Sequence, residues 1–231
     1  MYKSVLLKIS GELLKSEDSS FSYSKAMEYV EVIKDLRNRG VSVSIVMGGG
    51  NIFRGRDESS ISRGERDKIG MLATTMNGIF IRDTLKDVGI DSILLDSLGS
   101  LGSDNKYSKH LGLESLNKGK VLLLSGGMGV PYFSTDTAAA VRAIDLEVDL
   151  ILKATMVDGV YDKDPLEFKD AKKYDKIEYG KVIDLELGVM DMSSILLCRE
   201  YKKKILIFNG ANPKDIKKAI VDDENIGTYI Y

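Results

Sequence analysis

The sequence predicts an α/β fold in which a mostly parallel central sheet carries helices on both faces. Short apolar runs rich in Val, Ile and Leu alternate with segments of helical periodicity along the whole chain, which is the pattern of a parallel sheet. Three of these runs are followed directly by glycine turns, at Gly11, at Gly48–Gly50 and at Gly126–Gly129. Ligands bind at the carboxyl ends of parallel strands, so the three turns are expected to line one edge of the sheet and to meet one ligand there.

The first half of the chain supplies four of the expected strands. Ala26, Val30 and Ile33 recur at helical spacing, and Gly40 follows as a natural stop. The expected strands are Ser4–Ile9, Val41–Met47, Asp91–Leu95 and Lys120–Leu124, and the expected helices are about Ser24–Arg39 and Asp67–Lys86. The charged stretch Gly55–Arg66 has no periodicity and is interpreted as a mobile loop, and Gly99–Asn105 as a second loop.

The second half continues the alternation. Expected strands are Leu150–Ala154, Ile205–Phe208 and Thr228–Tyr231, and expected helices are Thr135–Leu146, about Val182–Lys202 and Pro213–Val221. The polar segment from the Asp158-Gly159 turn to Lys176 suits a hairpin. No Pro/Ser-rich linker or repeat divides the chain, so a single domain over residues 1–231 is expected.

Composition narrows the function. The net charge is −2 with both signs interspersed, so no basic footprint indicates nucleic acid. No apolar run approaches the roughly 20 residues of a membrane span, and the N-terminus does not resemble a signal peptide. The single cysteine, Cys198, suits a reducing cytoplasm and is expected to be a buried small hydrophobe.

The single histidine also restricts the chemistry. His110 lies in a polar stretch with no nucleophile elbow near it and is expected at the surface. One histidine and one cysteine exclude a His-rich metal site and a Cys/His zinc cluster. The chemistry is therefore expected to rest on Lys, Arg, Asp and backbone amides.

Gly48–Gly50 is the most informative turn. Three consecutive glycines have no side chains to pack, so the pattern favours close approach of the backbone to a ligand. A helix beginning at about Asn51 would point its positive end at the same place, and Arg54 would add a forked guanidinium. The pattern predicts a phosphate cradle, and a flexible turn is the alternative.

Other residues at strand ends are candidates for the same edge. Lys8 precedes the Ser10-Gly11 turn and can extend to a phosphate, or be an ordinary solvated lysine. Asp136 follows a helix-capping Ser134-Thr135 pair and either completes the cap or organises a cation. Lys153-Ala154-Thr155 closes a strand, and the tyrosine and acids of the following turn suit a nucleotide base or plain solvent. The sequence lacks the P-loop, the dinucleotide fingerprint and the protein-kinase set.

These blocks together resemble the bacterial uridylate kinase branch of the amino acid kinase family. The resemblance runs from Lys8 to about Thr228, over six ordered blocks. The blocks are Lys8–Glu12, Gly48–Gly55, Gly70–Gly78, Pro131–Asp136, Lys153–Tyr161 and Val189–Asp191.

The resemblance implies a kinase that transfers the γ-phosphate of ATP to UMP in pyrimidine nucleotide biosynthesis, with Mg²⁺. It implies that ATP is bound by Lys8, Ile9, Ser10, Gly11, Gly50, Arg54, Thr155, Tyr161 and Asp164. It implies that UMP is bound by Gly49, Asp67 and the loop of Met128, Gly129, Val130, Pro131, Tyr132, Phe133, Ser134 and Thr135. Lys8, Arg54, Asp136 and Asp191 would act at the reacting centre. A cytoplasmic homohexamer is implied, without a nucleic-acid or membrane partner.

Two alternatives stay open at this point. One is a kinase of the same family for a carboxylate, carbamate or other small acceptor. The other is a nucleotide-binding storage or regulatory protein on the same fold, although the charged residues needed for turnover are present.

The chain departs from the family pattern in two places. Met128 and Val130 stand where the family usually has threonine and asparagine, which weakens side-chain recognition of uracil. Residues 17–23 match poorly the glycine-rich segment that is linked to GTP activation in many members, so that regulation is not expected to carry over.

Overall fold

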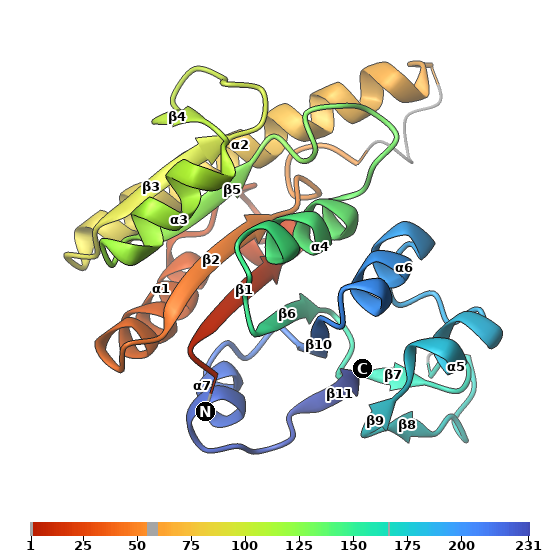
Figure 1. Ribbon diagram of the computed structural model, residues 1–231. Coiled ribbons are helices and arrows are strands. Elements are labelled where there is room, and N and C mark those ends of the chain that lie inside the picture. The colour runs from red at the N-terminus through yellow and green to blue at the C-terminus, as the bar shows by residue number, and fades with distance from the viewer. Residues whose placement is uncertain (1, 55–59, 166) are drawn as a thin grey trace.

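A computed structural model describes residues 2–54, 60–165 and 167–231. Among these residues, nine strands form one sheet in the order β4-β3-β5-β2-β1-β6-β10-β11-β9 (Figure 1). Every neighbouring pair is parallel except β10 and β11. The predicted mostly parallel α/β sheet is confirmed.

The strands are β1 (Ser4–Ile9), β2 (Ser42–Met47), β3 (Ser92–Asp96), β4 (Asn105–Lys106), β5 (Val121–Ser125), β6 (Leu150–Thr155), β9 (Lys176–Ile177), β10 (Lys204–Asn209) and β11 (Gly227–Ile230). Seven of them coincide closely with the predicted apolar runs, whereas the two-residue strands β4 and β9 were not predicted. The central strands are buried over nearly their whole length. A separate antiparallel hairpin, β7 (Val160–Tyr161) with β8 (Lys173–Tyr174), confirms the hairpin expected after Asp158.

Helices cover both faces, as predicted, because side chains alternate across each strand. The helices α1 (Tyr23–Asn38), α2 (Arg63–Asp87) and α7 (Asp215–Val221) pack with Leu7 and Leu152 on one face. On the other face, Leu6 and Ile151 pack with residues of α3 (Lys109–Asn117), α4 (Thr135–Asp145), α5 (Tyr179–Asp184) and α6 (Met192–Glu200). A short 3₁₀ turn, Gly11–Leu14, follows β1.

Two helix predictions were wrong, and one helix was missed. No helix begins at Asn51, where the chain forms a turn. The helix expected over Val182–Lys202 is two helices, because Glu186 adopts a left-handed φ of 48° after α5 and Asp191 caps a new helix. The helix α3 was missed, since its few apolar residues span little more than two turns; it carries the exposed His110.

The helix α2 begins earlier than predicted. Its first turn, from Arg63, lies inside the stretch expected to be a loop, because charged residues there mask the helical period. Of the rest of the stretch Gly55–Arg66, residues 55–59 lie outside the described residues, and residues 60–62 belong to neither a helix nor a strand.

Candidate functional site

Two lysines from neighbouring strands meet one buried aspartate at the carboxyl edge of the sheet. Lys8 of β1 and Lys153 of β6 occupy the same register position. Lys8 Nζ lies 2.9 Å from Asp136 Oδ1, and Lys153 Nζ lies 2.6 Å from Asp136 Oδ2. Asp136 stands in the first turn of α4, where Ser134 caps the helix by accepting hydrogen bonds from two backbone N–H groups. All three charged side chains are at least 85% buried, with exposed fractions of 14%, 9% and 15% in the order Lys8, Lys153 and Asp136.

The electrostatics of this cluster favour an anionic ligand. Burial alone would raise the pKa of Asp136, but the ammonium groups of Lys8 and Lys153 outweigh it and hold that pKa below its ordinary value. Burial lowers the pKa of Lys153, and Asp136 opposes that effect. Lys153 also donates a hydrogen bond to the carbonyl of Val189. Two cations around one carboxylate leave a net positive charge, which suits a phosphate.

The glycine turns after β1 and β2 pack against each other beside the lysines. A Cβ on Gly11 would lie 2.5 Å from Asn51 Oδ1 and 2.7 Å from the Gly50 nitrogen, so only glycine fits there. A Cβ on Gly49 would lie 2.8 Å from that of Ala73 on α2. The interpretation that these glycines have no part in packing was therefore wrong, because the chain around them is already in close contact.

Asn77 on α2 holds the second turn in place. Its Nδ2 donates to the carbonyl of Gly48 at 2.7 Å, and its amide exchanges two hydrogen bonds of 2.8 Å with Asn51. Asn77 is completely buried. Sequence reasoning missed this role, because a polar residue on a helix gives no indication of which turn it faces.

Arg54 is held by an acid in the 3₁₀ turn that follows β1. Its Nε and Nη2 both donate to Glu12 Oε1, at 2.8 and 2.7 Å, while Lys15 lies 2.5 Å from Glu12 Oε2. Burial would raise the pKa of Glu12, but Lys15 and Arg54 lower it below its ordinary value. The structure therefore places Arg54 at the correct edge, with its guanidinium engaged by a carboxylate that the sequence did not single out.

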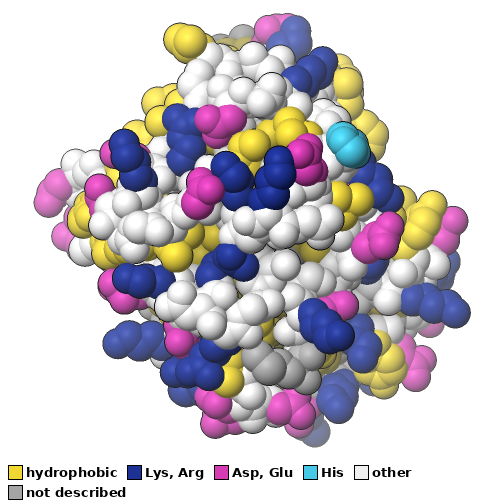
Figure 2. All heavy atoms as spheres, turned by 60° about the vertical axis from the view of Figure 1, so that its left-hand side comes forward, with side chains coloured by type: hydrophobic (Ala, Val, Ile, Leu, Met, Phe, Trp, Pro, Cys, Tyr) yellow, Lys and Arg dark blue, Asp and Glu magenta, His cyan; other side chains and the backbone are white. Residues whose placement is uncertain are grey.

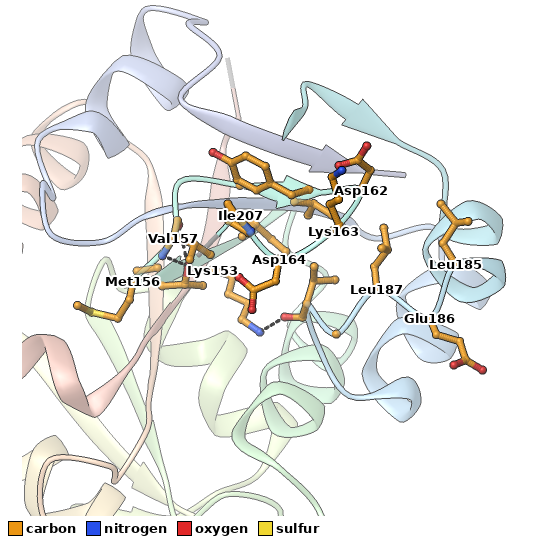
Figure 3. Close-up of a pocket in the computed structure, with 18 of the residues that line it drawn as sticks. Lys153, Met156, Val157, Asp162, Lys163, Asp164, Leu185, Glu186, Leu187 and Ile207 are labelled. Atoms are coloured by element: carbon orange, nitrogen blue, oxygen red, sulfur yellow. Dashed lines mark hydrogen bonds between the residues drawn. The ribbon is translucent and has the colours of Figure 1, made fainter. Parts of the chain in front are cut away.

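A cavity of about 660 Å³ opens next to Lys8 and Lys153. Thr155, Tyr161 and Asp164, three of the predicted ATP-binding residues, line it together with Ser10. Figure 3 shows Lys153 and Asp164 directed into this cavity and Glu186 directed away from it.

Not every predicted ATP-binding residue lines this cavity with a side chain. Ile9 is completely buried in the core, so it can offer a ligand backbone groups alone. One wall of the cavity consists of Leu185–Val189, the break between α5 and α6. Sequence reasoning placed that segment inside a helix and so missed it.

A second cavity, of about 350 Å³, is lined by Ser134 and Thr137, which flank Asp136 in the sequence. Four predicted UMP-binding residues line it, namely Asp67, Tyr132, Phe133 and Ser134. The rest of its wall consists of Arg63, Thr137, Asp191 and Ser193, of which Asp191 was predicted at the reacting centre. Asp67 Oδ2 accepts a hydrogen bond of 2.8 Å from the Tyr132 nitrogen, and the Arg63 guanidinium lies 5.4 Å from the centre of the Tyr132 ring. Tyr132 adopts a left-handed φ of 75°, so Asp67 stabilises a strained backbone position.

Asp191 is engaged in this wall. As N-cap of α6 it accepts a hydrogen bond from the Ser194 nitrogen at 3.0 Å. The hydroxyls of Ser134 and Thr137, at the start of α4, also donate to its carboxylate. Asp191 therefore joins the starts of two helices beside the lysine cluster.

The turn that leads into this wall is built on glycine. Gly126, Gly127 and Gly129 all have positive φ, at 72°, 54° and 79°. Met128, Gly129, Val130 and Pro131 lie in this turn, ahead of the residues that line the second cavity. Val130 is 48% exposed, so its side chain is available at the surface of the turn.

The carboxylates do not form a metal site by themselves. In the described ranges no three His, Cys, Asp or Glu side chains are grouped so that they could hold a metal ion. Both oxygens of Asp136 face lysines, and those of Asp191 face hydroxyl and amide donors.

The distribution of charged side chains on the surface agrees with the interspersed charges of the sequence. Figure 2 shows Lys and Arg interspersed with Asp and Glu over one face, without a continuous field of one sign. Within the described residues, no helix combines the length and hydropathy needed to cross a bilayer.

Comparison with known proteins identifies relatives over the whole chain. The chain is 40% identical to a uridylate kinase of Pseudomonas putida over 223 residues, which cover 95% of this chain and 90% of that protein. Its structure matches the crystal structure of a UMP kinase from Bacillus anthracis with a TM-score of 0.94 and 35% identity, covering 99% of this chain and 96% of the other. It also matches a UMP kinase from Ureaplasma parvum, with a TM-score of 0.93, 31% identity and coverage of 100% and 99%.

The family model described as "Amino acid kinase family" matches residues 3–209. That range contains the lysine pair, both cavities and the glycine turns. The chain belongs to the amino acid kinase family.

Proposed function

We propose that this protein is a UMP kinase that transfers the γ-phosphate of ATP to UMP, giving ADP and UDP for pyrimidine nucleotide synthesis. The observation that carries the proposal is a pair of cavities linked through Asp136: its partners Lys8 and Lys153 line the larger one, and Ser134 and Thr137, which flank it in the sequence, line the smaller one. Two substrates that meet at one positive centre are what phosphoryl transfer between two nucleotides requires. The names of the relatives support UMP as the acceptor.

In this proposal ATP occupies the larger cavity. Tyr161 and Asp164 would meet the base and sugar, and the triphosphate would extend toward Ser10, Gly11 and Lys8. The backbone of Gly50 and the guanidinium of Arg54 would be close to the transferred group. Arg54 would exchange its contact with Glu12 for phosphate oxygens, so its guanidinium would be bound to an anion both before and after ATP binds.

UMP would occupy the smaller cavity. The rings of Tyr132 and Phe133 provide apolar surface for a base, and Asp67 provides a carboxylate for ribose hydroxyls. The loop from Met128 to Thr135, with Gly49 opposite, would then enclose the nucleotide. The UMP phosphate would face Lys8 and Lys153 from the start of α4.

The chemistry follows from these positions. An oxygen of the UMP phosphate forms a bond to the γ-phosphorus while the bond to the bridging oxygen of ADP breaks. That oxygen is anionic near neutral pH, so no general base is needed, in agreement with a chain that has one exposed histidine. Lys8 and Lys153 neutralise the charge that shifts during transfer, and Asp136 fixes the two ammonium groups in position.

The remaining features of the proposal concern its setting. We expect the nucleotide to arrive with Mg²⁺ and the enzyme to work in the cytoplasm. We also expect an oligomer, with a hexamer as the specific expectation. The helix α2 supports this, because Ile69, Leu72 and Met76 lie three and four residues apart and are 37%, 50% and 46% exposed. A monomeric mass by light scattering at micromolar concentration would contradict this part.

A coupled ADP-release assay tests the central claim. Purified protein is given ATP and magnesium with UMP, CMP, dUMP or a panel of small carboxylate and carbamate acceptors. UMP is expected to be the best acceptor. A preference for a small acid would move the protein to another activity of the family, and binding of nucleotides without ADP release would indicate a regulatory or storage role.

A variant assay tests the site itself. Arg54→Ala is expected to lower turnover by about 100-fold or more, because a cation is lost where charge moves. Arg39→Ala is a matched control, since Arg39 also pairs with a carboxylate through Nε but lies at the end of α1. Equal activity of the two variants would remove Arg54 from the catalytic centre.

A further inference from the structure

A buried carboxylate outside the lysine cluster lies at the end of β3. Asp96 is completely buried and accepts four hydrogen bonds. The hydroxyls of Thr75 and Ser125 donate to Oδ2 at 2.5 and 2.7 Å, and the nitrogens of Leu98 and Ser100 donate to Oδ1 at 2.8 and 3.1 Å. Burial would raise its pKa, but these donors lower the pKa below its ordinary value. Asp96 therefore remains an anion held by neutral groups from α2, β5 and its own loop.

The carboxylate supports the turn that leads into the second cavity. Gly126 follows Ser125 with a φ of 72°, and a Cβ there would lie 2.9 Å from the Ser97 nitrogen and 3.0 Å from Asp96 Oδ2. The Gly126 nitrogen donates to Thr74 Oγ1 at 2.8 Å. The start of the turn is thus in direct contact with the buried network on one side.

Ser97 connects this network to the middle of the turn. Its hydroxyl donates to the carbonyl of Gly127 at 2.7 Å and accepts from Arg142 Nη2 at 3.0 Å. Arg142 is 8% exposed and its guanidinium lies 3.6 Å from the centre of the Tyr107 ring, so it cannot easily reorient. A Cβ on Gly129 would lie 3.2 Å from the Ser97 carbonyl oxygen. Ser97 therefore lies against the turn at three of its glycines, Gly126, Gly127 and Gly129.

We propose that Asp96 and Ser97 are positioning residues that set the geometry of residues 126–135, the acceptor loop, and hence the affinity of the protein for UMP. The inference rests on the proposed function, because it takes the smaller cavity as the acceptor site. Asp96 and Ser97 belong neither to the wall of that cavity nor to that of the larger one, so both act through Gly126–Gly129. The donor cavity has its own walls after β6 and between α5 and α6, so ATP binding is independent of them.

Ser97→Ala is the sharpest test, since it removes one hydroxyl without changing charge. Calorimetric titration with UMP is expected to show an increase in Kd of about fivefold, the factor that one net hydrogen bond corresponds to. The KM for UMP should rise in parallel while the KM for ATP is unchanged. Ser115→Ala is the matched control, because Ser115 is also buried and donates its hydroxyl to a backbone carbonyl, on α3 away from both cavities.

The outcomes separate the inference from the proposed function. If Ser97→Ala binds UMP as the wild type does, or raises the KM values for both substrates equally, the inference is overturned while the kinase assignment stands. If Ser115→Ala weakens UMP binding as much as Ser97→Ala, the effect is general destabilisation and the inference is likewise overturned. If the wild type neither binds nor phosphorylates UMP, the proposed function fails and the inference fails with it.

Discussion

The smaller and the larger cavity are constructed differently. The smaller one depends on the turn Gly126–Gly129, which is held by a buried hydrogen-bond network around Asp96. Asp96, Thr75 and Ser125 in this network are at most 3% exposed. The larger one is bordered by a hairpin whose contacts lie at the surface: Asp158 accepts from the Tyr161 hydroxyl at 2.7 Å and pairs with Lys173 at 3.0 Å, with side chains 49% and 33% exposed for the ion pair.

This difference has a physical consequence. Buried hydrogen bonds to a carboxylate fix a loop firmly, whereas exposed ion pairs contribute little and are screened by salt. On the proposed acceptor side, the turn is therefore held more firmly than the hairpin on the proposed donor side.

The largest expected effect removes the centre that both sides share. Lys8→Ala and Lys153→Ala should each lower turnover by about 100-fold or more, because each removes a cation from the point where charge shifts. Lys203→Ala is the control, since Lys203 also donates to a backbone carbonyl but contacts neither cavity. Steady-state rates with saturating ATP and UMP decide the matter, and turnover in either variant close to that of the control would remove the lysine pair from catalysis.

Stability tests the comparison itself. Asp96→Asn should lower the free energy of unfolding by about 1–3 kcal/mol. The reason is that the NH₂ group of asparagine would face the N–H and O–H donors that now bind the carboxylate, and would be buried without an acceptor. Asp158→Asn, on the exposed side, should leave unfolding by urea within the scatter of the wild type. Similar losses in the two variants would show that the two sides are equally rigid.

The pH dependence of stability sharpens the same contrast. The pKa of Asp96 in the folded protein lies below its ordinary value of 3.8. Its contribution to the free energy of unfolding is therefore complete above pH 3.8 and is lost as the pH falls through the pKa of the folded state. Asp96→Asn should therefore flatten the acid limb of the stability curve. An acid limb unchanged from that of the wild type, measured by urea unfolding from neutral to acid pH, would contradict this.

A smaller effect is expected at the wall of the acceptor cavity. Asp67→Asn replaces a charged acceptor for the Tyr132 nitrogen with a neutral one, so the KM for UMP should rise by about five- to tenfold with a smaller change in kcat. Asp83→Asn, further along α2, serves as the control. A collapse of kcat at unchanged KM would give Asp67 a different role.

The smallest effect concerns the base. Met128 lacks the hydroxyl that could read uracil, so Met128→Thr should increase the ratio of kcat/KM for UMP over CMP by about fivefold, equivalent to about 1 kcal/mol. An unchanged ratio would show that backbone groups read the base.

Much of the fold could be predicted because its strands are apolar runs that end in glycine turns. The position of Lys8 and Asp136 at one edge followed from the rule for parallel strands. The role of Lys153 was missed, although the signal was there: Lys8 and Lys153 each interrupt an apolar run shortly before its end.

Other parts of the site could not be read from the chain. The contact of Ser97 with Gly127 requires β3 to lie next to β5, and strand order does not follow from the periodicity of separate segments. The break between α5 and α6 depends on a left-handed backbone at Glu186, and glutamate is not a residue type that predicts this conformation.

The pairing of Lys8 with Lys153 across two strands has one more consequence. The spacing of the backbone ladder, about 4.8 Å between strands, sets the separation of the two backbone positions, and their shared register places both side chains on the same face of the sheet. Such a pair tolerates exchange of its apolar neighbours, but a one-residue deletion in β1 would turn Lys8 to the opposite face, toward α1. To transfer the Lys–Asp–Lys arrangement to another protein, one would therefore need two adjacent parallel strands and the start of one helix, with the register between the strands preserved.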